Sequence, residues 1–316
     1  MSVEVEDMEF GVMLTATSND YGLDEKEIPP AARRLTTTAE ECGLDAVVAG
    51  DHIAYPEDIP TDYEYSESGE PPFTTTTPIF DVFQLFGHLS AITDEVTLGT
   101  NVCSVPYRHP ILLAKNCLTA HALSDGRLEL GVAPGWLASE FDALDVPFKE
   151  RGARTDEFLE LFELVREEEV TGFEGEFTSF EPLGFYPNPD EPIPIQVGGK
   201  SGASIRRTAQ YGDGWTTIWD KPDDVKKTRE RIMNAWTDFE RSGDPEIVVT
   251  RPIHVGTDSK VSQDRFFVGE AESIIEDIEN YADAGVTRIN FDFYTTDVDE
   301  QVEQLERASD RILSAL

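Results

Sequence analysis

The sequence predicts an α/β fold of the TIM-barrel type, a closed (β/α)8 barrel with inserted loops. Three observations lead to this prediction. The chain of 316 residues suits one large barrel or two ordinary domains. Short apolar runs typical of buried parallel strands alternate with amphipathic segments along its whole length. Eight such pairs occur without a polar linker or a repeat of about 30 residues, so one barrel domain is expected over residues 1–316.

The first half of the chain supplies four strand–helix pairs. Strands are expected at residues 10–14, 45–50, 95–100 and 127–132. Helices are expected at residues 30–42, 81–92, 111–123 and 151–169. Gly43 directly after the first helix is a typical C-cap. A stretch rich in Pro and Thr, residues 55–78, indicates an inserted loop.

The second half continues the alternation. Strands are expected at residues 194–199, 214–219, 246–256 and 287–294. Helices are expected at residues 201–212, 223–242, 271–285 and 299–313. Residues 171–192 indicate a second loop-rich insert, and a loop is expected to follow the seventh strand up to residue 270. The alternative fold is a doubly wound open sheet, which is disfavoured because no Gly-x-Gly-x-x-Gly turn follows the first strand.

The charge is the most unusual feature of the composition. The chain has 63 acidic and 25 basic residues, which gives a net charge of −38. At 0.1 M salt the Debye length of about 10 Å leaves neighbouring carboxylates repelling each other, whereas at 1 M it falls to about 3 Å. The charge therefore predicts a halophilic protein, and the alternative is an acidic protein from ordinary salt. Nucleic acid is not an expected partner, because no basic stripe is present to neutralise phosphates.

The cellular compartment is predicted from the termini and the cysteines. The first ten residues are acidic and lack a basic and apolar leader, so no signal peptide is expected. No window approaches the roughly 18 apolar residues of a membrane span. The three scattered cysteines form no Cys-x-x-Cys pair. These features predict a reduced, cytoplasmic protein with no membrane partner.

Polar residues follow the second and third strands, where a barrel places its chemistry. Asp51 and His52 come directly after the second strand, and an imidazole exchanges protons near neutral pH. The alternative is a capping Asp beside a structural His. Asn101 and Val102 lie where the third strand leaves the barrel. Arg108, in the loop that follows, suits an anionic ligand or a surface acid equally well.

Two glycine-containing turns follow the fourth and fifth strands. Residues 133–136 read Ala-Pro-Gly-Trp, in which the first three let a ligand approach the backbone and Trp136 offers a flat apolar face. A core tryptophan is the alternative. Residues 198–201 read Gly-Gly-Lys-Ser before a helix, and free amides at a helix N-terminus favour an anion. This predicts a phosphate site, with an ordinary tight turn as the alternative.

Other catalytic motifs are missing from the sequence. The five histidines form no His-x-His or His-Glu-x-x-His pair, so no metal is expected. No Gly-x-Ser-x-Gly motif of a serine hydrolase occurs.

The strand-end blocks resemble the bacterial-luciferase-like family, in particular its deazaflavin-dependent branch, which uses coenzyme F420. The likeness covers most of the chain. It is strongest over residues 81–162, with VPYRHPILLAK, LSDGRLELGVAPGW, an E-F-x-A-L segment at 140–144 and FKERGARTDEFLEL. It resumes at PIPIQVGGKSGASIRRTAQYGDGW. With the acidic composition, the sequence resembles a haloarchaeal member.

The resemblance implies a hydride-transferring oxidoreductase with F420 as its cofactor and FMN as the alternative. The implied catalytic residue is His52, which would exchange the proton that accompanies the hydride. A non-prolyl cis peptide is implied at Asn101–Val102, behind the ring. The implied cofactor-binding residues are Asp51, Asn101, Val102, Ala133, Pro134, Gly135, Trp136, Gly198, Gly199, Lys200 and Ser201. The loops at residues 55–78 and 257–269 are expected to cover the site.

The sequence departs from the sugar-phosphate dehydrogenases of that family, which disfavours glucose phosphate as substrate. Where those enzymes place a catalytic glutamate this chain has Trp136, and where they place a tryptophan after the strand-two histidine it has Tyr55 and Pro56. Two other functions stay open: an FMN-dependent monooxygenase supplied by a partner reductase, and a cofactor-binding protein without turnover. A small-molecule substrate and a homodimer are the remaining expectations.

Overall fold

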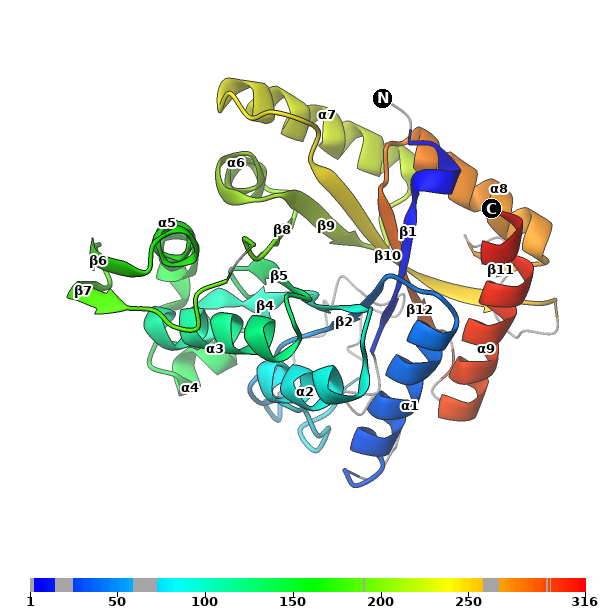
Figure 1. Cartoon of the computed structure of the whole chain (residues 1–316), viewed down its shortest axis with the longest axis horizontal. Helices are drawn as coiled ribbons and strands as arrows, with labels where there is room; N and C mark the ends of the chain where they lie inside the picture. Colours follow the sequence, from blue (N-terminus) through cyan, green and yellow to red (C-terminus); the bar gives the residue numbers. More distant parts are fainter. Residues whose placement is uncertain are drawn as a thin grey trace.

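Eight parallel strands close into a barrel that is surrounded by helices (Figure 1). The computed structural model describes residues 3–14, 25–58, 73–189, 191–257, 267–293, 295 and 297–316. The barrel strands are β1 (Glu9–Met13), β2 (Ala46–Ala49), β3 (Thr97–Thr100), β5 (Leu128–Ala133), β8 (Ile195–Gly198), β9 (Gly214–Ile218), β10 (Glu246–Val255) and β12 (Arg288–Phe293). β12 pairs with β1 and with β10, and β9 pairs with β10, so the ring is complete. The predicted TIM barrel is confirmed.

A helix follows each barrel strand, as the alternating pattern predicted. The eight helices are α1 (Ile28–Glu41), α2 (Val82–Leu89), α3 (Pro110–Leu123), α5 (Arg151–Glu167), α6 (Gly202–Tyr211), α7 (Pro222–Asp238), α8 (Ala271–Asp283) and α9 (Val298–Arg311). A short extra helix, α4 (Ala138–Ala143), follows β5. α7 ends four residues before the predicted end, because Glu240 and Gly243 take up left-handed backbone conformations that a helix cannot continue.

The second insert is a correction to the sequence analysis. Residues 171–192 were expected to be loop, but they contain most of an antiparallel hairpin, β6 (Val170–Glu174) with β7 (Ser179–Gly184). Thr171 and Phe173 alternate with more exposed neighbours, which is a strand pattern. The run is only five residues long and contains a glycine, so it was too short to identify. Figure 1 shows the hairpin projecting away from the barrel.

Two short strands extend the barrel wall at its carboxyl end. β4 (Cys103–Ser104) follows β3 after a two-residue break and pairs with β5. β11 (Val268–Gly269) pairs with the end of β10. No described helix combines the length and the apolar character that a bilayer crossing requires.

The two faces of each strand have different roles. On β12 the side chains of Ile289, Phe291 and Phe293 belong to the large apolar core that also contains helix residues. Arg288, on the other face, reaches across the barrel to hydrogen-bond Glu129 of β5. Since side chains alternate along a strand, every second residue of β12 from Arg288 onward points into the barrel.

Candidate active site

Asn101 forms the floor of the barrel mouth. Its side-chain Nδ2 donates to the hydroxyl of Thr250 at 2.8 Å, and Thr216 donates to its Oδ1 at 3.1 Å. These partners lie on β10 and β9, on the far side of the barrel from β3. The Asn101–Val102 peptide bond is cis, as the resemblance implied. The amide therefore closes the barrel interior directly below the carboxyl ends of the strands.

Close backbone packing beside this floor depends on one glycine. A Cβ atom on Gly131 would lie 2.0 Å from the carbonyl oxygen of Thr100, which no real side chain could tolerate. The same atom would lie 3.3 Å from a methyl group of Val102. β3 and β5 can thus approach each other where the chain leaves the barrel because residue 131 has no side chain.

Asp51 is held by protein donors. Arg108 donates to both of its carboxylate oxygens, at 2.7 and 2.9 Å, and the amide of Ser104 donates at 3.1 Å. Arg108 also donates to Asp81, the N-cap of α2, at 2.7 Å. Arg108 was expected to bind either an anionic ligand or an acidic side chain, and the structure shows ion pairs with Asp51 and Asp81. The cluster joins the loops after β2 and β3, so the Asp51 carboxylate holds these two loops together beneath the mouth.

His52 and Glu140 form a hydrogen-bonded dyad that joins the loops after β2 and β5. Nδ1 of His52 lies 2.8 Å from a carboxylate oxygen of Glu140, and the hydroxyl of Tyr107 donates to the same oxygen at 2.6 Å. The amides of Ile53 and Ala54 donate to the other oxygen at 2.5 and 3.1 Å. Four donors therefore fix a carboxylate that is only 3% exposed.

The protonation states of this cluster follow from its surroundings. Burial alone would raise the pKa of Glu140, but the hydrogen bonds from His52 and Tyr107 outweigh it and lower the pKa below its ordinary value. Burial and the neighbouring Glu140 carboxylate raise the pKa of Tyr107. Glu140 is thus an anion and Tyr107 a permanent donor. An anion at Nδ1 keeps the proton there, so the lone pair of a neutral His52 lies on Nε2.

Aromatic side chains surround the His52 ring. The ring centroid lies 5.0 Å from that of Tyr55, 5.9 Å from Phe73 and 6.0 Å from Trp136. Tyr55 and Phe73 stack on each other at 4.1 Å. The rings of Tyr55, Phe73 and Trp136 form a small apolar cluster with Leu137 and Ile79, apart from the main core. They place His52 in an apolar setting beside the Ala133–Trp136 turn.

The Gly198–Ser201 turn leads into α6 and leaves donors available at its N-terminus. Ser201 caps the helix by accepting from the amide of Ser204 at 3.1 Å. The amides of Gly202 and Ala203 donate to no acceptor in the described part of the chain. A Cβ on Gly202 would meet nothing within 4 Å, so the approach to these amides is open. The turn therefore fits a phosphate group.

Lys200 lies beside this turn but is paired. Its Nζ donates to Asp220 at 2.8 Å, and Arg231 of α7 donates to its backbone carbonyl at 3.2 Å. Its side chain is 55% exposed. An anion at the α6 N-terminus would compete with Asp220 for the ammonium group.

The predicted residues fall into three groups around the mouth. Asn101 and Val102 supply the floor, while Asp51, His52 and the Ala133–Trp136 turn lie on the β2 and β5 side. The Gly198–Ser201 turn lies at the end of β8. Within the described residues, no group of His, Cys, Asp or Glu side chains is arranged to hold a metal ion. Parts of the expected covering loops, residues 59–72 and 258–266, lie outside the described residues.

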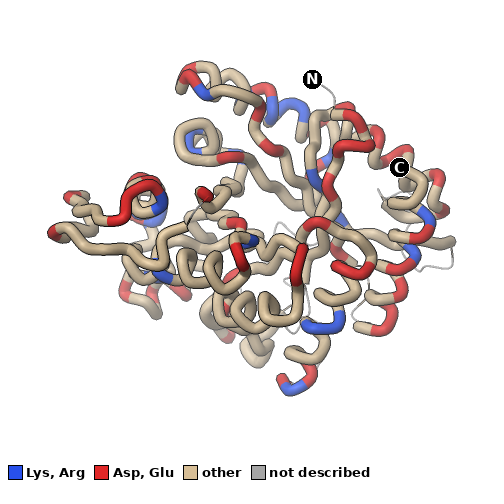
Figure 2. The backbone as a smooth tube through the Cα atoms, viewed as in Figure 1, with Lys and Arg blue, Asp and Glu red and all other residues tan. Residues whose placement is uncertain are grey.

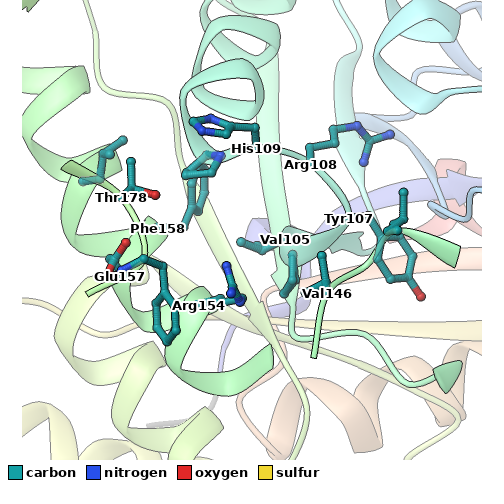
Figure 3. A pocket seen from close by; sticks show the side chains of 14 residues that line it. Val105, Tyr107, Arg108, His109, Val146, Arg154, Glu157, Phe158 and Thr178 are labelled. Atoms are coloured by element: carbon teal, nitrogen blue, oxygen red, sulfur yellow. Dashed lines mark hydrogen bonds between the residues drawn. The ribbon is translucent and has the colours of Figure 1, made fainter. Parts of the chain in front are cut away.

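The pockets with defined linings lie elsewhere. One of about 270 Å³ lies outside the barrel, between the start of α3, α5 and the β6–β7 hairpin. Arg108 and Tyr107 lie at one end of it, with Glu157 and Thr178 at the other (Figure 3). Another, of about 540 Å³, lies between α7 and α8. Neither is lined by Asp51, Trp136 or Lys200, so the shared mouth that these three were expected to line is not one of the two.

Sequence reasoning missed three residues at the mouth. Glu140 was noticed only within the family segment at 140–144, and Tyr107 only as a loop residue. Their partner His52 is far away in the sequence, so no local pattern could reveal the contact. Asp292, on the inner face of β12, had one available signal: it is the only acid inside the apolar strand RINFDF.

Comparison with known proteins gives a consistent family. The family model described as luciferase-like monooxygenase matches residues 8–266. An uncharacterised protein of Mycobacterium tuberculosis is 32% identical over 198 residues, covering 63% of this chain and 68% of that protein. An F420-dependent glucose-6-phosphate dehydrogenase of Kineococcus radiotolerans is 28% identical over 236 residues, covering 73% of this chain and 64% of the enzyme.

Solved structures share the fold at low identity. Monooxygenase RslO1 from Streptomyces bottropensis superposes with a TM-score of 0.80 at 20% identity, covering 98% of this chain and 99% of that one. An F420-dependent secondary alcohol dehydrogenase with an F420-acetone adduct superposes with a TM-score of 0.78 at 16% identity, covering 98% of this chain and 99% of that one. The oxygenating constituent of a Pseudomonas putida diketocamphane monooxygenase, in complex with FMN, superposes with a TM-score of 0.78 at 14% identity. The match covers 100% of this chain and 99% of that one.

Proposed function

Because the chain belongs to the luciferase-like monooxygenase family, we propose that it is an oxidoreductase that transfers a hydride between coenzyme F420 and a small organic substrate. The observation that carries this proposal is the His52–Glu140 dyad, which lies in an apolar setting at the same mouth as the α6 turn. Relatives named as F420-dependent support the choice of coenzyme.

The bound deazaflavin would supply the hydride chemistry. The chain's own residues bind the coenzyme and orient the reacting groups. The amides at the start of α6 bind the phosphate, and Asn101 and Val102 support the ring from below. His52 has its Nδ1 tied to Glu140, so its Nε2 is available to exchange a proton with a substrate oxygen. The surrounding aromatic rings exclude water from that nitrogen and favour an uncharged substrate over a sugar phosphate.

FMN is the second candidate, since solved structures of this fold include an FMN-bound monooxygenase. The test is a fluorescence and absorbance titration of the protein with F420 and with FMN at high salt. We expect the dissociation constant for F420 to be at least tenfold lower, about 1.4 kcal/mol in binding free energy. Tighter binding of FMN, together with oxygen uptake by the protein when it holds reduced FMN, would assign the monooxygenase function instead.

We further propose that the acidic surface adapts the protein to high salt. Figure 2 shows acidic residues on most elements and few basic ones, in line with the net charge of −38. Screening at molar KCl removes most of the repulsion between these carboxylates. We expect the melting temperature to rise by roughly 10 °C or more between 0.1 and 3 M KCl, which is about 6–7 kcal/mol for a chain of this size. Equal melting temperatures would refute the adaptation.

A further inference from the structure

Asp292 lies inside the barrel at the level of the mouth. It occupies the same face of β12 as Arg288, four residues earlier, which spans the barrel interior to Glu129. Asn290, between them, also points inward, because its Oδ1 would lie 2.3 Å from a Cβ atom on Gly11. Asp292 is thus the inward-facing residue of β12 nearest its carboxyl end.

The carboxyl group of Asp292 has almost no protein partners. Asp292 is paired in the strand register with Pro252 of β10, and proline has no backbone N–H that could donate to the carboxyl group. Its one hydrogen bond in the described part of the chain comes from the amide of Phe293, at 2.8 Å. Burial raises the pKa of Asp292 to about 6, against the lowering effect of that bond. Within the described residues, no basic side chain compensates for its burial.

Of the other titratable side chains on these strands, His254 shares the inward face near the mouth, and the rest point outward or lie at the far end. β12 and its two neighbours, β1 and β10, carry Glu9, Glu246, Arg251, His254 and Arg288. Glu9, Glu246 and Arg288 begin their strands at the opposite end of the barrel. Arg251 points outward, where its guanidinium lies 5.8 Å from the Trp219 ring centroid. His254 lies two residues beyond Pro252 on the same inward face of β10, so its imidazole is the titratable group that shares the mouth end of the barrel with Asp292. Its backbone amide donates to the carbonyl of Phe267 at 2.8 Å.

Maintaining an unpaired carboxyl group in such a place costs stability, so a functional reason is expected. The strand order supplies one. From β8, where the phosphate turn lies, three steps around the barrel lead to β2 in one direction and to β12 in the other. A coenzyme with its phosphate at β8 and its ring across the mouth therefore points toward β1, with His52 on one side and Asp292 on the other.

We propose that Asp292 binds the pyrimidine edge of the coenzyme ring, donating a hydrogen bond to a ring carbonyl and accepting one from the ring N–H. This inference rests on the proposed function. F420 and FMN share that edge, on which an N–H lies between two carbonyl groups. A carboxylic acid offers one donor and one acceptor, which matches half of the edge. The ionised form offers only acceptors and would repel the carbonyl oxygens.

The test is coenzyme binding by the wild type and by Asp292→Asn, measured by fluorescence from pH 5 to pH 8.5 with both FMN and F420. An amide keeps one donor and one acceptor at every pH. We expect the wild type to lose affinity as pH rises above 6, approaching tenfold per pH unit. D292N should keep its affinity and bind at least tenfold more tightly than the wild type at pH 8. Ionisation of the FMN phosphate affects both proteins equally, so their difference isolates residue 292.

Two further measurements make the test decisive. Asp292→Leu should bind both coenzymes weakly at all pH values. FMN methylated at the ring N–H should lose affinity for the wild type but not for D292L. Asp283→Asn, an exposed residue of α8, is the matched control for charge. Parallel pH curves for the wild type and D292N would overturn this inference alone, whereas no binding of either coenzyme by either protein would overturn the proposed function as well.

The same substitution has an expected effect on stability that verifies folding. A carboxyl whose pKa is raised on folding contributes less stability as pH rises, because the unfolded state ionises first. The wild type should therefore lose stability relative to D292N as pH increases through 6. A melting temperature for D292N at pH 8 equal to or above that of the wild type would show that its change in binding is not a folding defect, and the melting temperature of D292L checks that variant in the same way.

Discussion

Glu140→Gln is expected to lower turnover by a factor of about 10² to 10⁴, the contribution that a positioned general acid–base group typically makes. Glu140 accepts four hydrogen bonds through two oxygens. Glutamine has one oxygen and an NH2 group, so two of the four donors lose their acceptor. The proton on Nδ1 of His52 is then no longer favoured, and the ring can present a protonated Nε2 to the substrate.

The readout that separates positioning from simple damage is the tautomer of His52. Nitrogen NMR of the wild type should show the proton on Nδ1, and E140Q should show a mixture or the reverse. Asp142→Asn, an exposed change on the same short helix, should alter neither turnover nor tautomer. His52→Ala should cost as much as E140Q or more, and the double variant should cost little beyond H52A because both residues act as one unit. Wild-type turnover by E140Q would remove Glu140 from the mechanism.

The barrel could be predicted because its signals are local. Each buried strand is a short apolar run such as Ala46–Ala49, and some helices carry their own start signal, such as Asp81 before α2. Eight repeats of that pattern leave few alternatives. The β6–β7 hairpin was missed because β6 is only five residues long and contains Gly172, which weakens the local strand pattern.

The site could be predicted only in outline. Strand ends identify the loops that meet at the mouth, which is why His52 and Trp136 were found and do approach each other. Which side chains bond is decided by tertiary contacts that no local pattern encodes. His52 and Glu140 are 88 residues apart, and Asp51 and Arg108 are 57 apart. Asp292 required the register of the closed barrel before its position inside the mouth became apparent.

Arg288→Met is expected to reduce the free energy of unfolding by about 3–5 kcal/mol, the cost of removing one partner of a buried ion pair. Arg288 and Glu129 are each only 4% exposed and bond directly across the barrel base. Glu9 lies 3.6 Å from the same guanidinium. Without the guanidinium, Glu129 would be a buried carboxylate close to two other acids, Glu9 and Glu246, with no cation to offset it.

The pH dependence of unfolding and a second substitution that compensates for the first test this expectation. Burial raises the pKa of Glu9 and of Glu246, and both values should rise further in R288M. Stability that depends on protonated carboxyl groups decreases as pH rises, so R288M should lose more stability than the wild type between pH 5 and pH 8. Urea is the appropriate denaturant, because guanidinium chloride would screen the charges. The double variant Glu129→Leu with R288M should recover most of the loss, since apolar replacement of a buried pair is often neutral. A single variant within about 1 kcal/mol of the wild type would mean that water at the barrel base already solvates Glu129.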